Sequence, residues 1–150
     1  VLPHPGGLGA LARKNRHLHT LKLTRGYPSR GVIETFPNPK PGRPFVIRHE
    51  CPEFTSVCPK TGQPDFATII LTYIPNETCI ELKSLKLYYY SFRNEGIYYE
   101  AVVNRLLDEL AASCQPQYMR VTGHFNVRGG IGSVVYAETG PAPEGIFTNA

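Results

Sequence analysis

Hydrophobic residues change their spacing several times along the chain, and each change predicts a different element. The segment Phe66–Ile74 is rich in β-branched and aromatic residues, which favours a strand that ends before Pro75. Because this segment is apolar on both faces, we expect it in the centre of a sheet. The segment Arg43–Glu50 is also typical of a strand. Residues 51–64 contain three prolines and one glycine, and are expected to form a loop.

The spacing then becomes helical. Apolar residues recur every three or four positions until Gly96, and a second helical set ends before Pro116. The apolar positions are Leu82, Leu85, Tyr89 and Phe92 in the first set, and Tyr99, Val102, Val103, Leu106, Leu107 and Leu110 in the second. Strict alternation returns in Met119–Val127, which predicts a strand. A turn at 128–130 is expected to lead into a final strand at Ile131–Ala137.

The order strand, strand, helix, helix, strand, strand predicts an α+β domain, in which two helices cover one face of an antiparallel four-stranded sheet. Such a sheet has two unpaired edges, so we expect several copies to assemble into a larger barrel. We place this single domain at residues 31–138. Residues 1–30 are expected to be a disordered basic leader, and residues 139–150 a flexible tail.

Composition and charge exclude several classes of protein. The chain has 150 residues and no run near the roughly 18 apolar residues of a membrane helix, and no apolar secretory segment is seen. We therefore expect a cytoplasmic protein without a membrane partner. The net charge of +4 is uneven, since residues 1–33 hold six basic and no acidic side chains. The remainder is nearly neutral, which does not favour direct binding to nucleic acid.

The four cysteines are too scattered for a disulfide framework, and no CxxC pair is present. His49, Cys51 and Cys58 do not have the spacing of a common structural zinc site, so no metal is expected. Thiols that stay reduced remain available for chemistry. The sequence leaves open whether Cys51 pairs with Cys58 on oxidation.

Cys58 lies between prolines, and Asp65 follows seven residues later at the entrance to a predicted strand. This pair suits a thiolate nucleophile with a nearby proton carrier. Because a free thiol has a pKa of about 8.5, the nucleophile needs a lowered pKa. Lys60 is expected to help lower it, whereas an ionised Asp65 would oppose this. The same spacing also suits a packing cysteine and an aspartate that caps a strand.

Four more charged side chains are placed where a ligand could use them. Lys83 and Lys86 share one face of the first predicted helix, which suits either a phosphate clamp or a solvated surface. Glu100 begins the second helix, where it could accept two hydrogen bonds from a guanine-like base or simply favour the helix dipole. Arg128 could reach a phosphate, although its glycine-rich turn is not a dinucleotide-binding fingerprint.

Taken together, four segments resemble the QueF family of 7-cyano-7-deazaguanine reductases, in its short single-module form. This family belongs to the tunnelling-fold (T-fold) superfamily, with GTP cyclohydrolase I. The segments are PEFTSVCPKTGQPDFATI (Pro52–Ile69), ELKSLKLY (Glu81–Tyr88), SFRNEG (Ser91–Gly96) and FNVRGGI (Phe125–Ile131). ELKSLKLY matches the family's highly specific signature. The resemblance covers residues 31–137 and implies the tunnelling fold.

The resemblance also implies an activity, namely NADPH-dependent reduction of the nitrile of 7-cyano-7-deazaguanine, a step in queuosine modification of tRNA. Cys58 would form a thioimide with the nitrile carbon, and Asp65 would be the general acid and base. Substrate binding is implied for Ile80, Glu81, Leu82, Tyr99 and Glu100, and NADPH phosphate binding for Lys83, Lys86 and Arg128. Many members have a histidine where this chain has Tyr99, which leaves hydrogen bonding or stacking for that side chain. The family implies a homodecamer of two pentamers, with sites at subunit interfaces.

Three alternatives keep the fold but change the function. A related amidinotransferase branch uses the same Cys/Asp pair to add ammonia to cyano-deazaguanine in tRNA, but the intact ELKSLKLY segment and the near-neutral body argue against it. A zinc-dependent cyclohydrolase would need a Cys/His ligand set that the sequence lacks. A non-catalytic protein that binds purines or pterins would keep Glu100 but would not need Cys58.

Overall fold

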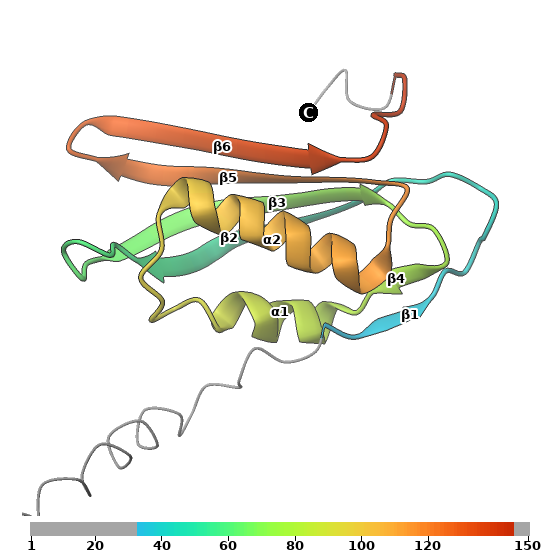
Figure 1. Ribbon diagram of the computed structural model, residues 1–150, viewed down its shortest axis with the longest axis horizontal. Helices are drawn as coiled ribbons and strands as arrows, with labels where there is room; N and C mark the ends of the chain where they lie inside the picture. The colour runs from blue at the N-terminus through green and yellow to red at the C-terminus, as the bar shows by residue number, and fades with distance from the viewer. Residues whose placement is uncertain (1–32, 146–150) are drawn as a thin grey trace, which may run out of the picture.

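The computed structural model describes residues 33–145, which form one main sheet with two helices against it (Figure 1). The elements are β1 (Thr35–Pro37), β2 (Ile47–Val57), β3 (Pro64–Ile74), β4 (Thr78–Ile80), α1 (Leu82–Tyr90), α2 (Tyr99–Cys114), β5 (Tyr118–Arg128) and β6 (Ile131–Thr139). The predicted α+β class and the order of four long strands and two helices are confirmed. The leader predicted for residues 1–30 lies outside the described residues.

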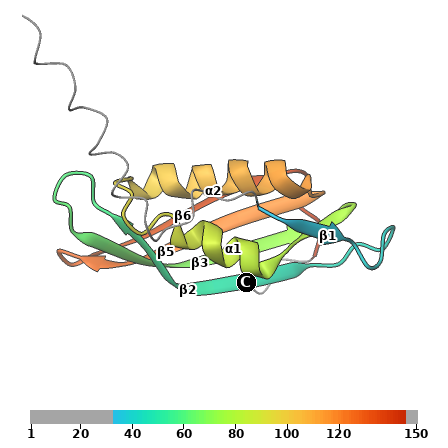
Figure 2. The same cartoon turned by 90° about the horizontal axis from the view of Figure 1, so that it is seen from below.

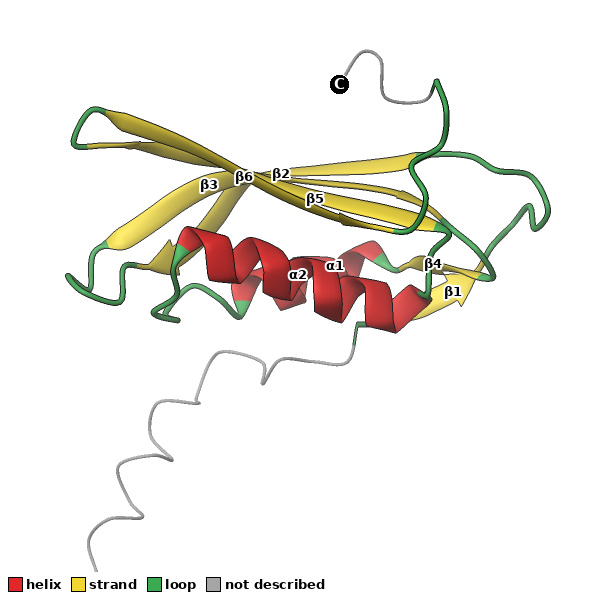
Figure 3. Cartoon of the chain, turned by 45° about the horizontal axis from the view of Figure 1, so that its top comes forward, coloured by secondary structure: helices red, strands yellow, loops and turns green. Residues whose placement is uncertain are grey.

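The main sheet is antiparallel throughout, with the strand order β2-β3-β5-β6. The central position predicted for Phe66–Ile74 is confirmed, because β3 pairs with β2 on one side and with β5 on the other. Alternate residues of β3 from Asp65 to Tyr73 are buried, whereas those between them are exposed or half-buried. Both helices lie on the buried face of this sheet (Figures 2 and 3).

Local signals explain where the helices begin and end. The Glu81 carboxylate caps α1 by accepting hydrogen bonds from the backbone N–H groups of Lys83 and Ser84, both at 2.7 Å. Helix α2 ends at Gln115, which has a left-handed φ of 45° and precedes Pro116. Helix α2 also packs closely on β5, where Gly123 has no side chain to separate them. A Cβ atom at Gly123 would lie only 3.0 Å from Val103 Cγ2.

Two parts of the fold differ from the sequence prediction. Residues 51–57 are not a loop but the second half of β2, which contains a register shift between Cys51 and Phe54. Pro52 lies at this irregularity on an edge strand, where a missing N–H is tolerated. The pairing of β1 with β4 was also missed, because three-residue strands are too short to show an alternating pattern.

No helix between residues 33 and 145 has the length and apolar character needed to cross a membrane. The β2–β3 turn, the β5–β6 turn and the start of α2 lie together at one end of the sheet, whereas α1 begins at the other end (Figure 1). This arrangement decides which of the candidate functional residues can meet within one chain.

Candidate active site

Cys58 lies directly after β2, in the turn that leads into β3. Its backbone N–H donates to the carbonyl of Gln63 at 2.8 Å, and its own carbonyl accepts from the N–H of Gly62 at 2.9 Å. Gly62 has a φ of 72°, a conformation that costs glycine little and other residues more. The backbone of the turn is therefore fixed on both sides of the thiol.

The Cys58 thiol is partly exposed and faces several hydrogen-bond donors. The Thr61 hydroxyl, the Thr61 backbone N–H and the Lys60 backbone N–H lower the pKa of the thiol, in that order of importance. Burial and the charge of Asp65 raise the pKa of the thiol to a smaller extent, as expected for an acidic neighbour. The expected help from Lys60 comes through its backbone N–H. A lowered pKa increases the share of nucleophilic thiolate at neutral pH.

Asp65 begins the buried face of β3, and only 5% of the residue is exposed. Its Oδ1 atom lies 3.0 Å from Arg128 Nε and accepts a hydrogen bond from the Tyr99 hydroxyl at 3.2 Å. The Arg128 guanidinium also donates to Gln63 Oε1 at 2.8 Å and to the Pro64 carbonyl. A buried carboxylate is costly without partners, so the Arg128 guanidinium and the Tyr99 hydroxyl together hold Asp65 in place.

Tyr99 is the first residue of α2, and its ring stacks on Phe125 with the ring centroids 3.8 Å apart and the planes at 11°. The pKa of Tyr99 is raised first by burial and then by the charge of Asp65 and the hydrogen bond to it. The phenol therefore stays protonated and acts as a donor to Asp65. At this position the chain uses a stacked phenol to orient a carboxylate.

These side chains share a cavity of about 400 Å³. It is lined by Cys58, Pro59, Thr61, Asp65, Ile97, Tyr98, Tyr99, Glu100 and Arg128. Five predicted site residues thus meet, although they come from the β2–β3 turn, the start of β3, α2 and the end of β5. The thiol is not sealed in the core, and Glu100 opens onto the same space. The cavity can therefore hold a ligand between a thiol and a carboxylate.

The other five predicted site residues lie elsewhere, around the end of β4 and the first part of α1. They are Ile80, Glu81, Leu82, Lys83 and Lys86. The nine residues of α1 span about 13 Å, and the Cys58 turn lies beyond the far end of this helix (Figure 1). The Ile80 side chain is buried in the core, and the backbone N–H groups of Lys83 and Ser84 lower the pKa of Glu81. Within one chain this group does not join the Cys58 cavity.

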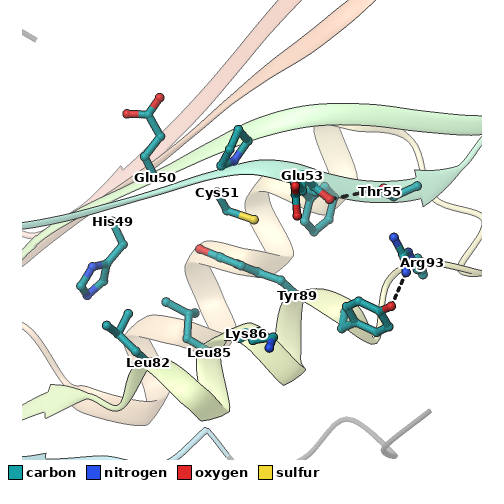
Figure 4. A pocket seen from close by; sticks show the side chains of 13 residues that line it. His49, Glu50, Cys51, Glu53, Thr55, Leu82, Leu85, Lys86, Tyr89 and Arg93 are labelled. Atoms are coloured by element: carbon teal, nitrogen blue, oxygen red, sulfur yellow. Dashed lines mark hydrogen bonds between the residues drawn. The ribbon is translucent and has the colours of Figure 1, made fainter. Parts of the chain in front are cut away.

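A second cavity of about 460 Å³ lies between β2 and α1 (Figure 4). Leu82 and Lys86 line it from α1, opposite His49 and Cys51 on β2. The Tyr89 hydroxyl is buried beside it and has no hydrogen-bond partner within residues 33–145. Two of the predicted ligand residues, Leu82 and Lys86, therefore face a space that is separate from the thiol.

The position of Cys51 answers the question of a disulfide with Cys58. Cys58 directly follows β2 and lies seven residues after Cys51, so the extended strand places the two cysteines about 20 Å apart, whereas a disulfide requires Cα atoms within about 7 Å. A Cys51–Cys58 bond within one chain is excluded in this fold. No group of three or more His, Cys, Asp or Glu side chains in the described part of the chain is placed to hold a metal ion.

Two contributors to the site were missed from the sequence. Thr61 provides the strongest effect on the pKa of Cys58, and only its place three residues after the cysteine hinted at this. Phe125 covers one face of the Tyr99 ring. The alternating pattern of Met119–Val127 indicated that Phe125 is buried but did not indicate this partner. Both contacts depend on how the chain folds back on itself.

Several known proteins are similar to this chain in sequence. The family model described as "QueF-like protein" matches residues 64–144. A relative from Anaeromyxobacter sp. (strain K), named NADPH-dependent 7-cyano-7-deazaguanine reductase, is 63% identical over 119 residues, which cover 79% of this chain and 97% of the relative. A relative of the same name from Thiobacillus denitrificans (strain ATCC 25259 / T1) is 64% identical over 107 residues, which cover 71% of this chain and 77% of the relative.

A similar fold is found among solved structures. The crystal structure of the archaeosine synthase QueF-Like in the apo form aligns with a TM-score of 0.62 and 28% sequence identity. The alignment covers 67% of this chain and 99% of that one. The arrangement of strands and helices is therefore shared with a protein named as a synthase, whereas the more similar sequences are named as reductases.

Proposed function

Since this chain belongs to the family of QueF-like proteins, we infer that it is an NADPH-dependent oxidoreductase that reduces 7-cyano-7-deazaguanine to 7-aminomethyl-7-deazaguanine, a step in queuosine biosynthesis. The observation that carries this function is a thiol with a lowered pKa that opens onto a cavity beside Asp65 and Glu100. The high identity to relatives named as reductases supports the same reaction.

The Cys58 sulfur supplies the nucleophile that a nitrile needs. A thiolate donates an electron pair to the nitrile carbon while the nitrogen takes up a proton, and the product is a thioimide bound to Cys58. NADPH, when bound, supplies hydride at this carbon. After the first reduction the sulfur leaves as a thiolate and an imine remains, which a second reduction and a second proton convert to the amine. Two NADPH and two protons are consumed for each amine formed.

Asp65 is proposed to carry these protons. Its carboxylate lines the same cavity as the thiol, and its orientation is held by Tyr99 and Arg128. General acid–base catalysis of this kind contributes about 10²- to 10⁴-fold to a rate. Glu100 is exposed in this cavity, where its carboxylate can accept two parallel hydrogen bonds from the amide and amino edge of the deazaguanine.

The side chains proposed for the cofactor fit a phosphate-bearing molecule to different degrees. Lys83 and Lys86 are exposed on α1, and Lys86 borders the second cavity, so their ammonium groups are available to phosphates. Arg128 is already paired with Asp65, and would have to exchange that carboxylate for a phosphate. We therefore assign the NADPH phosphates to the two lysines first.

We propose that a second copy of the chain completes the site. The thiol cavity and the group around Glu81 and Leu82 are separated within one chain, but a neighbouring copy could place its α1 against the Cys58 cavity. The edge strands β2 and β6 each pair on one side only, which suits continuation of the sheet into another copy. A homodecamer of two pentamers would contain ten chains of 16.7 kDa, and light scattering tests this number.

We further propose a cytoplasmic setting and a free deazaguanine base as the substrate. A reaction that depends on a reduced thiol suits a compartment that keeps thiols reduced. The near-neutral body is not suited to gripping RNA. The amidinotransferase alternative is not favoured, because the archaeosine synthase structure is 28% identical whereas the two relatives named as reductases above are 63% and 64% identical.

The decisive experiment follows NADPH absorbance with and without 7-cyano-7-deazaguanine. We expect two NADPH oxidised for each amine formed, and no oxidation without the nitrile. Mass spectrometry of the protein with the nitrile alone should show an adduct that is absent in Cys58→Ala. An adduct of equal yield in that variant would contradict the mechanism, and a lack of nitrile-dependent NADPH oxidation would contradict the function.

A further inference from the structure

The segment between the two helices, residues 91–97, touches the nucleophile turn on both sides of Cys58. The Val57 N–H donates to the Glu95 carbonyl at 2.9 Å, and the Ile97 N–H donates to the Val57 carbonyl at 3.1 Å. These bonds pair Val57 with Gly96 in a short parallel bridge. On the other side, a Cβ atom at Gly96 would lie 3.5 Å from Pro59 Cα, so the backbones lie in contact. Val57 and Pro59, on either side of Cys58, thus both contact residues 91–97, which we call the support segment.

An ion-pair network holds this support in place. Glu95 Oε1 accepts from Arg105 Nη1 at 2.6 Å, and the two side chains are only 22% and 33% exposed. Arg105 Nε also donates to Glu109 Oε1 at 3.0 Å, and the Tyr88 hydroxyl donates to Glu109 Oε2 at 2.5 Å. The network therefore connects α1, residues 91–97 and α2. A partly buried, multiply bonded arginine is worth more than an isolated surface pair.

We propose that Arg105 is a positioning residue for the Cys58 nucleophile, and that it acts through Glu95. It holds the Glu95 side chain. The backbone of residues 95–97 then holds Val57 through two hydrogen bonds and contacts Pro59 at Gly96. This inference rests on the proposed role of Cys58 in nitrile reduction.

Arg105 does not line the thiol cavity, so it has no direct access to the substrate. The supported segment does reach that cavity, since Ile97 and Tyr98 form part of its wall and lead into Tyr99 and Glu100. Loss of the support would shift the thiol and this wall relative to one another. A displacement of about 1 Å in a reacting group can cost about 100-fold in rate. Because the turn keeps its own backbone hydrogen bonds, we expect a smaller loss.

The test compares Arg105→Met and Glu95→Gln with the wild-type protein. We expect kcat to fall about tenfold in each variant, with KM for the nitrile changed by less than about threefold, because ground-state binding is not altered. The pH dependence of iodoacetamide alkylation at Cys58, located by mass spectrometry, should move to higher pH as the donors of the turn loosen. Arg105→Lys keeps a cation for Glu95 and should recover part of kcat.

The matched control is Arg48→Met, which removes an exposed ion pair with Glu50 (3.4 Å) at the opposite end of β2. It should leave the alkylation profile of Cys58 unchanged, and this profile is the readout that decides. An alkylation profile in folded Arg105→Met that matches the wild type would overturn the inference, even if turnover fell. Should Arg105→Met fail to fold, the near-isosteric Glu95→Gln decides in the same way. The alkylation comparison needs no turnover, so it decides on Arg105 even if the proposed reaction fails.

Discussion

The pair formed by Asp65 and Arg128 gives the most direct test of the site geometry. Asp65 is almost fully buried, and the distance from its Oδ1 to Arg128 Nε is 3.0 Å. Replacing Arg128 by Met would leave a buried carboxylate with the Tyr99 hydroxyl as its remaining side-chain partner. Breaking a fully buried ion pair costs about 3–5 kcal/mol. The Arg128 side chain is 37% exposed, so screening by solvent lowers our expectation to about 2 kcal/mol.

The expected loss can be measured by unfolding. A loss of about 2 kcal/mol corresponds to roughly 5–10 °C in Tm for a chain of this size. Because the chain contains no tryptophan, far-ultraviolet circular dichroism is a suitable signal. Protein concentration has to be held constant, since association adds to apparent stability. The control is Arg120→Met. Arg120 lies on β5, as Arg128 does, and stacks on Tyr136 of β6.

A double-mutant cycle separates the pair from other effects. Asp65→Asn removes the buried charge, so adding Arg128→Met to it should cost much less than Arg128→Met alone. We expect a coupling energy of about 1.5 kcal/mol, compared with the roughly 0.3–0.5 kcal/mol scatter of independent sites. Coupling within that scatter would refute the reasoning and show that the two side chains are not paired in solution. A role in phosphate binding alone would raise KM for NADPH without any coupling in the free protein.

Three other predictions concern single side chains of the site. Thr61→Ala removes the donor with the largest effect on the pKa of Cys58, so this pKa should rise towards that of an ordinary thiol. The midpoint of iodoacetamide alkylation should then move to higher pH, and an unchanged midpoint would contradict the assignment. Tyr99→Phe keeps the stacking but loses the hydrogen bond to Asp65, worth about 1 kcal/mol, so kcat should fall about fivefold; equal kcat in both proteins would deny the phenol a role. Lys83→Ala should raise KM for NADPH more than KM for the nitrile, and steady-state kinetics showing the reverse order would displace the proposed phosphate contact.

Much of the fold was predictable because its elements are long and periodic. The four main strands and both helices each contain enough residues for alternating or helical spacing to show. The second half of β2 was missed because Pro52 and Pro59 resemble loop signals, although an edge strand with a register shift accepts a proline. Strands β1 and β4 were missed because three residues hold no period.

The candidate site was predictable to a different degree. The resemblance to the QueF family pointed to Cys58, Asp65 and Glu100, and the structure places all three on one cavity. The same resemblance gave no sign that the residues around Glu81 would lie a helix length away. It also gave no sign that Arg128 would pair with Asp65. Distances between segments depend on packing, which is not visible in local patterns.

The sequence by itself determined most of the long strands, both helices and the α+β class, since these depend on residue types and spacing along a short stretch of chain. Its resemblance to a family also led to the proposal of Cys58 as the nucleophile. Only the tertiary structure decided the surroundings of the Cys58 thiol. The Thr61 donors, the pairing of Asp65 with Arg128 and the support of Cys58 by residues 91–97 form when turns and helix ends meet at one end of the sheet. A thiol's pKa and position depend on groups within a few ångströms in space, and many of these are distant in sequence.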